Sequence, residues 1–188
     1  MIKMLLLALV LTVNPSVARI DVPDGNMISS GSGTLVAKDV VITNWHVVVD
    51  NSDDEITVTF YDGHKYDAKI IKTDKVWDLA ALRLSKPVAN KVIKLGEIPE
   101  IGDKLTIAGY GKGKYQESTG KLIQFVAPGK DGPTDILELE ASVRQGDSGG
   151  PILDSKGRLV GVLFGGKDGL TNGSHIGRVK EFLESCTK

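Results

Sequence analysis

Ser148 is the residue whose surroundings most suggest chemistry, because it lies in the glycine-rich stretch Gln-Gly-Asp-Ser-Gly-Gly-Pro at 145–151. A serine hydroxyl is a weak nucleophile at neutral pH and needs a base that takes up its proton. When a serine attacks a carbonyl group, backbone N–H groups can stabilise the oxyanion that forms. We expect the N–H groups of Gly146 and Ser148 to be these donors, while Gly149 and Gly150 permit a tight backbone.

A histidine and a carboxylate are the natural partners of such a serine, because imidazole titrates near neutrality and a carboxylate can orient it. His46 follows the apolar run Val-Val-Ile-Thr, and Asp78 precedes the apolar run Leu-Ala-Ala-Leu, which would shield it from water. Their rivals His64 and Asp74 have the surroundings of exposed turn residues. Each of the three motifs alone is a weak indication. Their combination supports the hypothesis that Ser148 is a nucleophile, with His46 as its base and Asp78 orienting the imidazole.

The elements that must position these residues are short strands. Runs rich in β-branched and apolar residues alternate with turn signals such as Asp62-Gly63 and Lys156-Gly157. This pattern predicts an all-β fold of antiparallel barrels or a sandwich, and not a parallel sheet with crossover helices. Residues 176–186 alone show helical spacing of apolar residues, which predicts a closing amphipathic helix.

Residues 1–18 have the pattern of a secretory signal peptide. Lys3 precedes an apolar run at 4–13, and small residues at 16 and 18 predict cleavage after Ala18. The run is shorter than the roughly 20 residues of a membrane-spanning helix, although an uncleaved anchor is the alternative. We therefore expect a secreted or periplasmic protein that has no membrane association after cleavage. The single cysteine, Cys186, excludes an internal disulfide.

The three motifs together, in the order His46, Asp78, Ser148, resemble those of the chymotrypsin-like serine proteases, and most closely those of short bacterial trypsin-like peptidases and the HtrA protease module. The resemblance implies two six-stranded antiparallel β-barrels and a C-terminal α-helix. The expected boundaries are an N-terminal barrel at about 27–86, a connection at about 87–100, a C-terminal barrel at about 101–175 and a helix at about 176–186. The resemblance also implies that the protein is a serine endopeptidase that forms an acyl-enzyme on Ser148.

The sequence departs from these relatives in informative ways. We expect no PDZ domains, because few residues follow the predicted helix, and Asp147 stands where HtrA enzymes usually have asparagine. In trypsin zymogens a new N-terminus pairs with that aspartate. Here Ile20 follows Arg19, but the residues after Ile20 differ from those at a zymogen cleavage site, so zymogen activation is not expected. We expect the Asp147 carboxylate to form an internal ion pair or hydrogen bond instead.

The resemblance also locates a primary specificity pocket. Its base corresponds to Ser142 and not to an aspartate, so cleavage after Lys or Arg is not expected. An uncharged pocket with one histidine suits a small, polar or acidic side chain. The expected wall residues are Phe164, Gly165 and Gly166, and His175 is a further candidate that could equally be an ordinary core or loop residue.

Other functions fit the sequence less well. A net charge of −1 favours neither nucleic acid nor an anionic membrane surface as a partner. Scattered histidines give no zinc motif, and we expect no metal and no cofactor. An esterase of the α/β-hydrolase type would need its acid and histidine after the serine. A catalytically inactive binding or toxin-like protein on the protease fold is the main alternative to an endopeptidase that acts on proteins or peptides.

Overall fold

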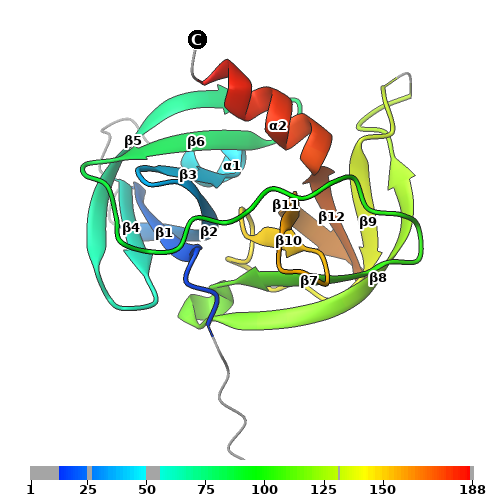
Figure 1. Cartoon of the computed structure of the whole chain (residues 1–188), viewed down its shortest axis with the longest axis horizontal. Coiled ribbons are helices and arrows are strands. Elements are labelled where there is room, and N and C mark those ends of the chain that lie inside the picture. The colour runs from blue at the N-terminus through cyan, green and yellow to red at the C-terminus, as the bar shows by residue number, and fades with distance from the viewer. Residues whose placement is uncertain (1–12, 25–26, 50–55, 131, 187–188) are drawn as a thin grey trace, which may run out of the picture.

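The computed structural model describes residues 13–24, 27–49, 56–130 and 132–186, so most of the predicted signal peptide lies outside the described residues. Two closed six-stranded barrels lie side by side, and a helix crosses the top of the view in Figure 1. Every pairing between neighbouring strands is antiparallel. The expected fold class is confirmed.

The first barrel has the strand order β1-β2-β3-β6-β5-β4. Its interior is filled by side chains that alternate along the strands, as in β4, where Ile56, Val58 and Phe60 are buried. A short helix, α1, follows β3. The elements are β1 (Val17–Asp24), β2 (Met27–Ala37), β3 (Val40–Thr43), α1 (Trp45–Val48), β4 (Ile56–Phe60), β5 (Lys65–Asp74) and β6 (Leu79–Leu84).

The second barrel repeats the same closed arrangement with the order β10-β11-β12-β9-β8-β7. Leucine and isoleucine side chains of five strands, among them Leu105, Leu122 and Ile152, form its core. The elements are β7 (Lys104–Gly109), the 3₁₀ turn η1 (Gly111–Gly113), β8 (Gln116–Val126), β9 (Ile136–Glu140), β10 (Pro151–Leu153), β11 (Leu159–Lys167), β12 (Leu170–His175) and the helix α2 (Ile176–Ser185).

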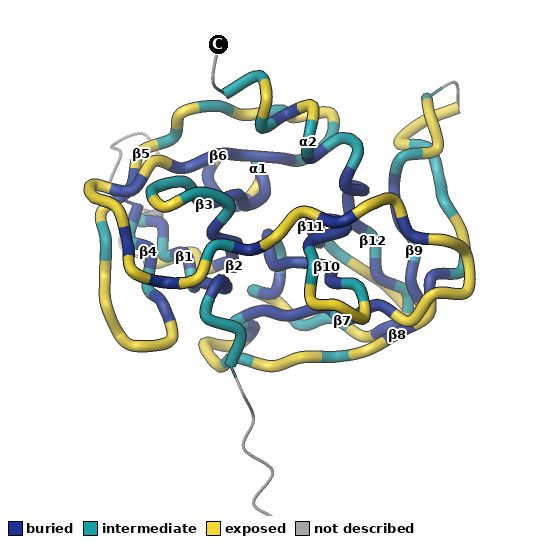
Figure 2. The backbone as a smooth tube through the Cα atoms, viewed as in Figure 1, coloured by how far each residue is buried: buried dark blue, intermediate teal, exposed yellow. Residues whose placement is uncertain are grey.

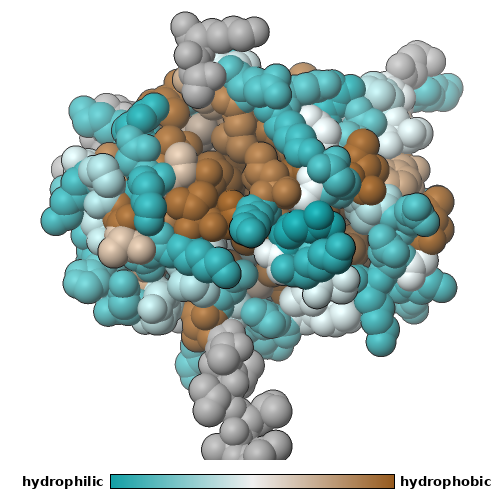
Figure 3. All heavy atoms as spheres, viewed as in Figure 1, coloured by the Kyte–Doolittle hydropathy of each residue, from teal (hydrophilic) through white to brown (hydrophobic). Residues whose placement is uncertain are grey.

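A third apolar cluster joins the two barrels. It combines Ile42 and Leu79 of the first barrel with Leu159 and Val162 of the second, and α2 covers it with one apolar face. Figure 2 shows buried segments on both sides of the segment that connects β6 to β7, and Figure 3 shows apolar side chains gathered between α2 and the first barrel. Because both barrels contribute to one core, their relative position is set by burial. The helix residues that face the core are Ile176, Val179 and Phe182.

The first barrel begins earlier than the sequence analysis placed it. Strand β1 starts at Val17, ahead of the expected boundary at about residue 27, and pairs with both β2 and β4. Val17 and Ala18 are fully buried, and the Ser16 hydroxyl donates to the Lys91 carbonyl. Cleavage after Ala18 would therefore remove the first residues of a barrel strand. No helix in the described part of the chain is long and apolar enough to cross a membrane.

We predict that a chain that starts at Arg19 is less stable than one that starts at Val13. Loss of the buried Val17 side chain and of the adjoining hydrogen bonds should lower the free energy of unfolding by about 2–5 kcal/mol. Urea denaturation of the two purified chains measures the difference. Equal midpoints and slopes would show that residues 13–18 add nothing to the barrel.

Candidate active site

The Ser148 loop lies where the two barrels meet. The Ser148 carbonyl accepts a hydrogen bond from the Ser32 N–H at 2.8 Å, and the Ser32 hydroxyl donates to the Gly146 carbonyl at 2.8 Å. Gly149 has φ +85°, and a Cβ there would collide with the Ser32 carbonyl and the Thr43 hydroxyl. A side chain on Gly150 would strike the Ala108 carbonyl. Both glycines are therefore needed for the loop to fit between the barrels.

His46 and Asp78 come together because β3 and β6 are neighbours in the first barrel. Thr43, three residues before His46, pairs with Ala80, two residues after Asp78. The His46 Nδ1 lies 2.6 Å from one carboxylate oxygen of Asp78, and the His46 backbone N–H donates to the other at 2.9 Å. The imidazole side chain is 43% exposed, whereas the carboxylate side chain is 19% exposed. Such a pair holds the ring in one orientation and leaves Nε2 free for a substrate or a nucleophile.

The Ser148 loop adjoins the segment that carries His46, but the Ser148 hydroxyl makes no hydrogen bond to the described atoms of His46 or Asp78. Gly31 lies between Val47, the residue after His46, and the Ser148 loop, because a Cβ on Gly31 would approach both the Val47 side chain and, at 3.2 Å, the Ser148 carbonyl. The Ser148 hydroxyl donates to the Phe164 carbonyl at 3.5 Å, and no hydrogen bond between it and His46 is present among the described residues. Catalytic hydrogen bonds often form or shorten only when substrate binds.

The predicted oxyanion donors differ from their neighbours in how their N–H groups are used. The N–H groups of Asp147, Gly149 and Gly150 donate to the carbonyls of Arg144, Leu163 and Asp147. For the N–H groups of Gly146 and Ser148, the described part of the chain shows no acceptor. The loop thus leaves free the two donors that an oxyanion would need.

Asp147 is held by an ion pair within the same loop. Its carboxylate accepts from the Arg144 Nη2 at 2.7 Å and Nε at 3.1 Å, and also from the backbone N–H groups of Arg144 and Gly111. Asp147 is 6% exposed, and side chains on Gly109 or Gly111 would overlap its carboxylate. Ile20, the residue that a zymogen mechanism would free, is buried in β1. This arrangement supports the expectation that Asp147 pairs internally.

The residues expected in the specificity pocket are only partly together. Phe164 and Gly165 belong to β11 and lie beside Ser148. A Cβ on Gly165 would meet nothing within 4 Å, so there is open space beside this residue. Gly166 packs against Val143, the residue after Ser142. Ser142 is itself exposed and lines a small hollow of about 120 Å³ with Asp147.

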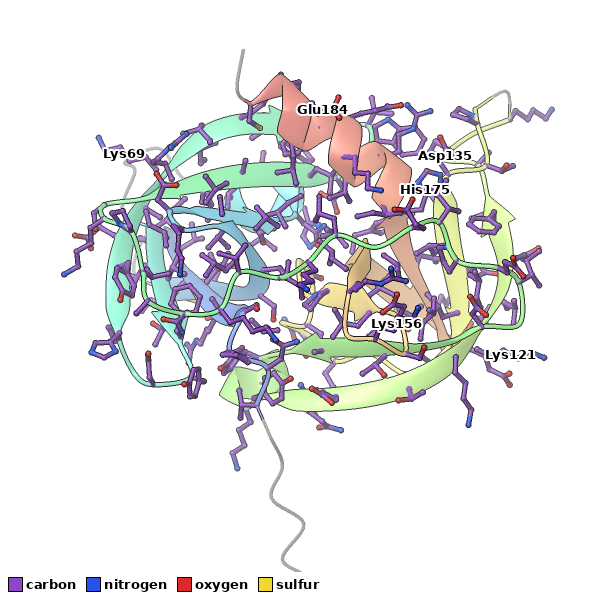
Figure 4. All side chains as sticks on the ribbon, viewed as in Figure 1. Lys69, Lys121, Asp135, Lys156, His175 and Glu184 are labelled. Atoms are coloured by element: carbon purple, nitrogen blue, oxygen red, sulfur yellow. The ribbon has the colours of Figure 1, made fainter. Side chains whose placement is uncertain are left out.

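His175 has a different role from the one expected of it. Its Nδ1 accepts hydrogen bonds from the N–H groups of Gly177 and Arg178, so it caps α2, and its Nε2 lies 3.0 Å from Asp135. Figure 4 shows His175 and Asp135 together at the start of α2. Both ring nitrogens are engaged and the side chain is buried, so the assignment of His175 to the substrate pocket was wrong. The His175 ring instead accepts two backbone N–H groups in the first turn of α2, which would otherwise lack a partner within the helix.

A second hollow, of about 400 Å³, adjoins Gly146. Its lining combines the exposed apolar residues Met27 and Ile28 with Tyr110. Burial, with a smaller contribution from the Asp62 carboxylate, raises the pKa of the Tyr110 phenol. The sequence analysis missed this hollow because its walls come from β2 and from the segments around η1 and Gly146.

Comparison with known proteins identifies the family. A family model for the trypsin-like peptidase domain matches residues 31–162. The chain belongs to this family. Serine protease Do-like HtrA of Bacillus subtilis is 30% identical over 148 residues, covering 71% of this chain and 32% of that protein. Serine protease Rv3671c of Mycobacterium tuberculosis is 30% identical over 168 residues, covering 83% and 41%. Anti-sigma-I factor RsgI9 of Acetivibrio thermocellus is 34% identical over 137 residues, covering 72% and 19%.

Solved structures of other proteases show the same fold. The inactive form of the Rv3671c protease matches with a TM-score of 0.79 and 25% identity, over 94% of this chain and 91% of that one. The serine endoprotease from Yersinia pestis matches with a TM-score of 0.81 and 23% identity, over 93% and 63%. The chain spans less than half the length of the curated relatives it matches.

We predict that Arg144→Ala destabilises the trypsin-like domain strongly. The variant leaves the buried Asp147 carboxylate without its guanidinium, a change that typically costs about 3–5 kcal/mol. Arg158→Ala is the matched control, because it breaks an arginine–aspartate pair with Asp154 on the more exposed β10–β11 turn and should cost about 0–1 kcal/mol. Thermal denaturation of both variants measures the difference. Similar losses would mean that the Asp147 pair has no special importance.

Proposed function

We propose that this chain is a secreted or periplasmic serine endopeptidase that hydrolyses peptide bonds through His46, Asp78 and Ser148. The observation that carries the proposal is the combination of a His46–Asp78 pair at 2.6 Å with a neighbouring serine loop whose Gly146 and Ser148 N–H groups are unused. Membership of the trypsin-like peptidase family supports it, as do relatives named as serine proteases. The apolar N-terminal run supports export.

In the first step His46 Nε2 takes the proton of the Ser148 hydroxyl while the oxygen attacks the carbonyl carbon of the scissile peptide bond. Asp78 stabilises the imidazolium that forms. The carbonyl oxygen becomes an oxyanion and accepts hydrogen bonds from the Gly146 and Ser148 N–H groups, each worth about 2.7–4 kcal/mol in the transition state.

In the second step the tetrahedral intermediate collapses. The C–N bond breaks, and the His46 imidazolium gives its proton to the leaving amine, so an acyl group remains on Ser148. A water molecule then attacks this ester with His46 again as base. The acid product leaves and the serine hydroxyl is restored, which balances one water consumed against one peptide bond broken.

Ser148→Ala tests the proposed function directly. We expect the variant to lose labelling by a fluorophosphonate and to hydrolyse casein about 10⁴-fold more slowly, because the nucleophile is gone. Ser155→Ala, on the exposed β10–β11 turn, is the control and should label and cleave as wild type does. If wild type and Ser148→Ala digest casein at the same rate, the assignment of the nucleophile is wrong.

The primary specificity is expected to exclude basic side chains. Ser142 offers no negative charge to a lysine or arginine, and no atom lies within 4 Å of a Cβ built on Gly165. A positional peptide library should therefore show no enrichment of Lys or Arg before the cleaved bond. A strong preference for either would contradict this interpretation of the pocket.

A binding protein without activity is the second candidate. It is favoured by the Ser148 hydroxyl facing Phe164 instead of His46, and by a relative that is named as an anti-sigma factor. The labelling experiment separates the two functions, since an inactive scaffold would react with fluorophosphonate no faster than the Ser148→Ala variant.

A further inference from the structure

Asn44 is a fully buried polar residue that the reaction scheme does not use. It lies between β3 and α1, two residues before His46. Its side-chain Nδ2 donates to the backbone carbonyl of Asp78 at 2.7 Å, across 34 positions of sequence. A carbonyl oxygen can only accept, so this bond also determines which end of the amide faces Asp78.

Helix capping does not account for this asparagine. Asn44 is the N-cap residue of α1, yet its side chain makes no capping hydrogen bond. Its Oδ1 is buried and has no partner among the described residues, which is unfavourable for stability. An apolar side chain of similar size would avoid the unpaired Oδ1 but would leave the Asp78 carbonyl without this donor. What the asparagine supplies is one donor, aimed at Asp78.

The second barrel supplies a matching donor on the other side of the same residue. Ser174 of β12 is fully buried, and its hydroxyl donates to the Trp77 carbonyl at 2.6 Å. The Trp77 carbonyl belongs to the peptide group before the Asp78 Cα, and the Asp78 carbonyl to the peptide group after it. Two hydrogen bonds that restrain the peptide groups on either side of the Asp78 Cα also restrain its φ and ψ angles.

Those angles need support because Asp78 has φ +51°, in the left-handed region. Aspartate tolerates this region better than most residues, but it remains unfavourable and persists where the surroundings impose it. The carboxylate position depends on it, since the same residue reaches His46 through both oxygens.

We propose that Asn44 and Ser174 are positioning residues that clamp the Asp78 backbone, one from each barrel, so that its carboxylate stays aligned with His46. The inference rests on the proposed function for its catalytic consequence. The clamp also makes the His46–Asp78 pair sensitive to the contact between the two barrels, because one of its two donors comes from the second barrel.

The test uses a readout of the pair itself. The proton between His46 Nδ1 and Asp78 should give a low-field ¹H NMR signal in the full chain. We expect Asn44→Leu and Ser174→Ala each to shift this signal upfield or broaden it away. Both should lower kcat about 10- to 100-fold with KM nearly unchanged, the size of effect that a misplacement of about 1 Å produces.

Thr171→Val is the matched control. Thr171 lies on the same strand as Ser174, is fully buried, and donates to the Ala141 carbonyl at 2.7 Å, so the variant loses an equivalent bond away from Asp78. It should keep the low-field signal. If Asn44→Leu fails to fold, Asn44→Ser replaces it, because serine suits an N-cap but its hydroxyl is too short to reach Asp78.

Failure of the clamp and failure of the proposed function give different results in these experiments. An unchanged signal and an unchanged kcat in the Asn44 and Ser174 variants overturn the clamp, and so does an equal loss of signal in Thr171→Val. Should the wild-type chain prove inactive, the proposed function fails, but the signal still decides whether the two donors hold Asp78.

Discussion

The short contact between His46 and Asp78 depends on an unfavourable backbone conformation. At φ +51° the Asp78 carboxylate can accept from both the imidazole and the backbone N–H of His46. Local structure does not favour this conformation, so the tertiary structure must impose it. Pairing of β3 with β6 brings the two residues near each other, and the buried donors of Asn44 and Ser174 hold the adjoining carbonyls.

The serine loop is fixed by a different kind of interaction. Around Ser148 the constraints are space and buried charge: glycines at 149 and 150 let the loop pass between the barrels, and the Arg144–Asp147 pair anchors it from inside. A buried pair of this kind contributes little net stability in many proteins, but removal of one partner is costly. In the same loop, the N–H groups of Gly146 and Ser148 have no acceptor among the described residues. Electrostatic preorganisation of this sort is usually the largest contribution to such catalysis.

The shared core connects the two halves of the site. Residues of β3, β6, β10, β11 and α2 form one apolar cluster, so neither barrel buries its surface fully without the other. His46 and Asp78 belong to the first barrel and Ser148 to the second, and their distance therefore depends on that core. The capping of α2 by His175 serves the same end, because α2 covers the cluster.

The sequence alone determined the features that depend on local pattern. Alternating apolar residues predicted the strands, the spacing of Ile176, Val179 and Phe182 predicted the closing helix, and the neighbours of His46, Asp78 and Ser148 singled these residues out. The tertiary structure decided what depends on contacts between distant residues: the start of the first barrel at Val17, the capping role of His175 and the donors to Asp78 from positions 44 and 174. An apolar N-terminal segment has the same local pattern in a leader and in a strand, and a buried histidine has the same neighbours in a pocket and at a helix cap. Only the packing partners, which are far away in the chain, distinguish these alternatives.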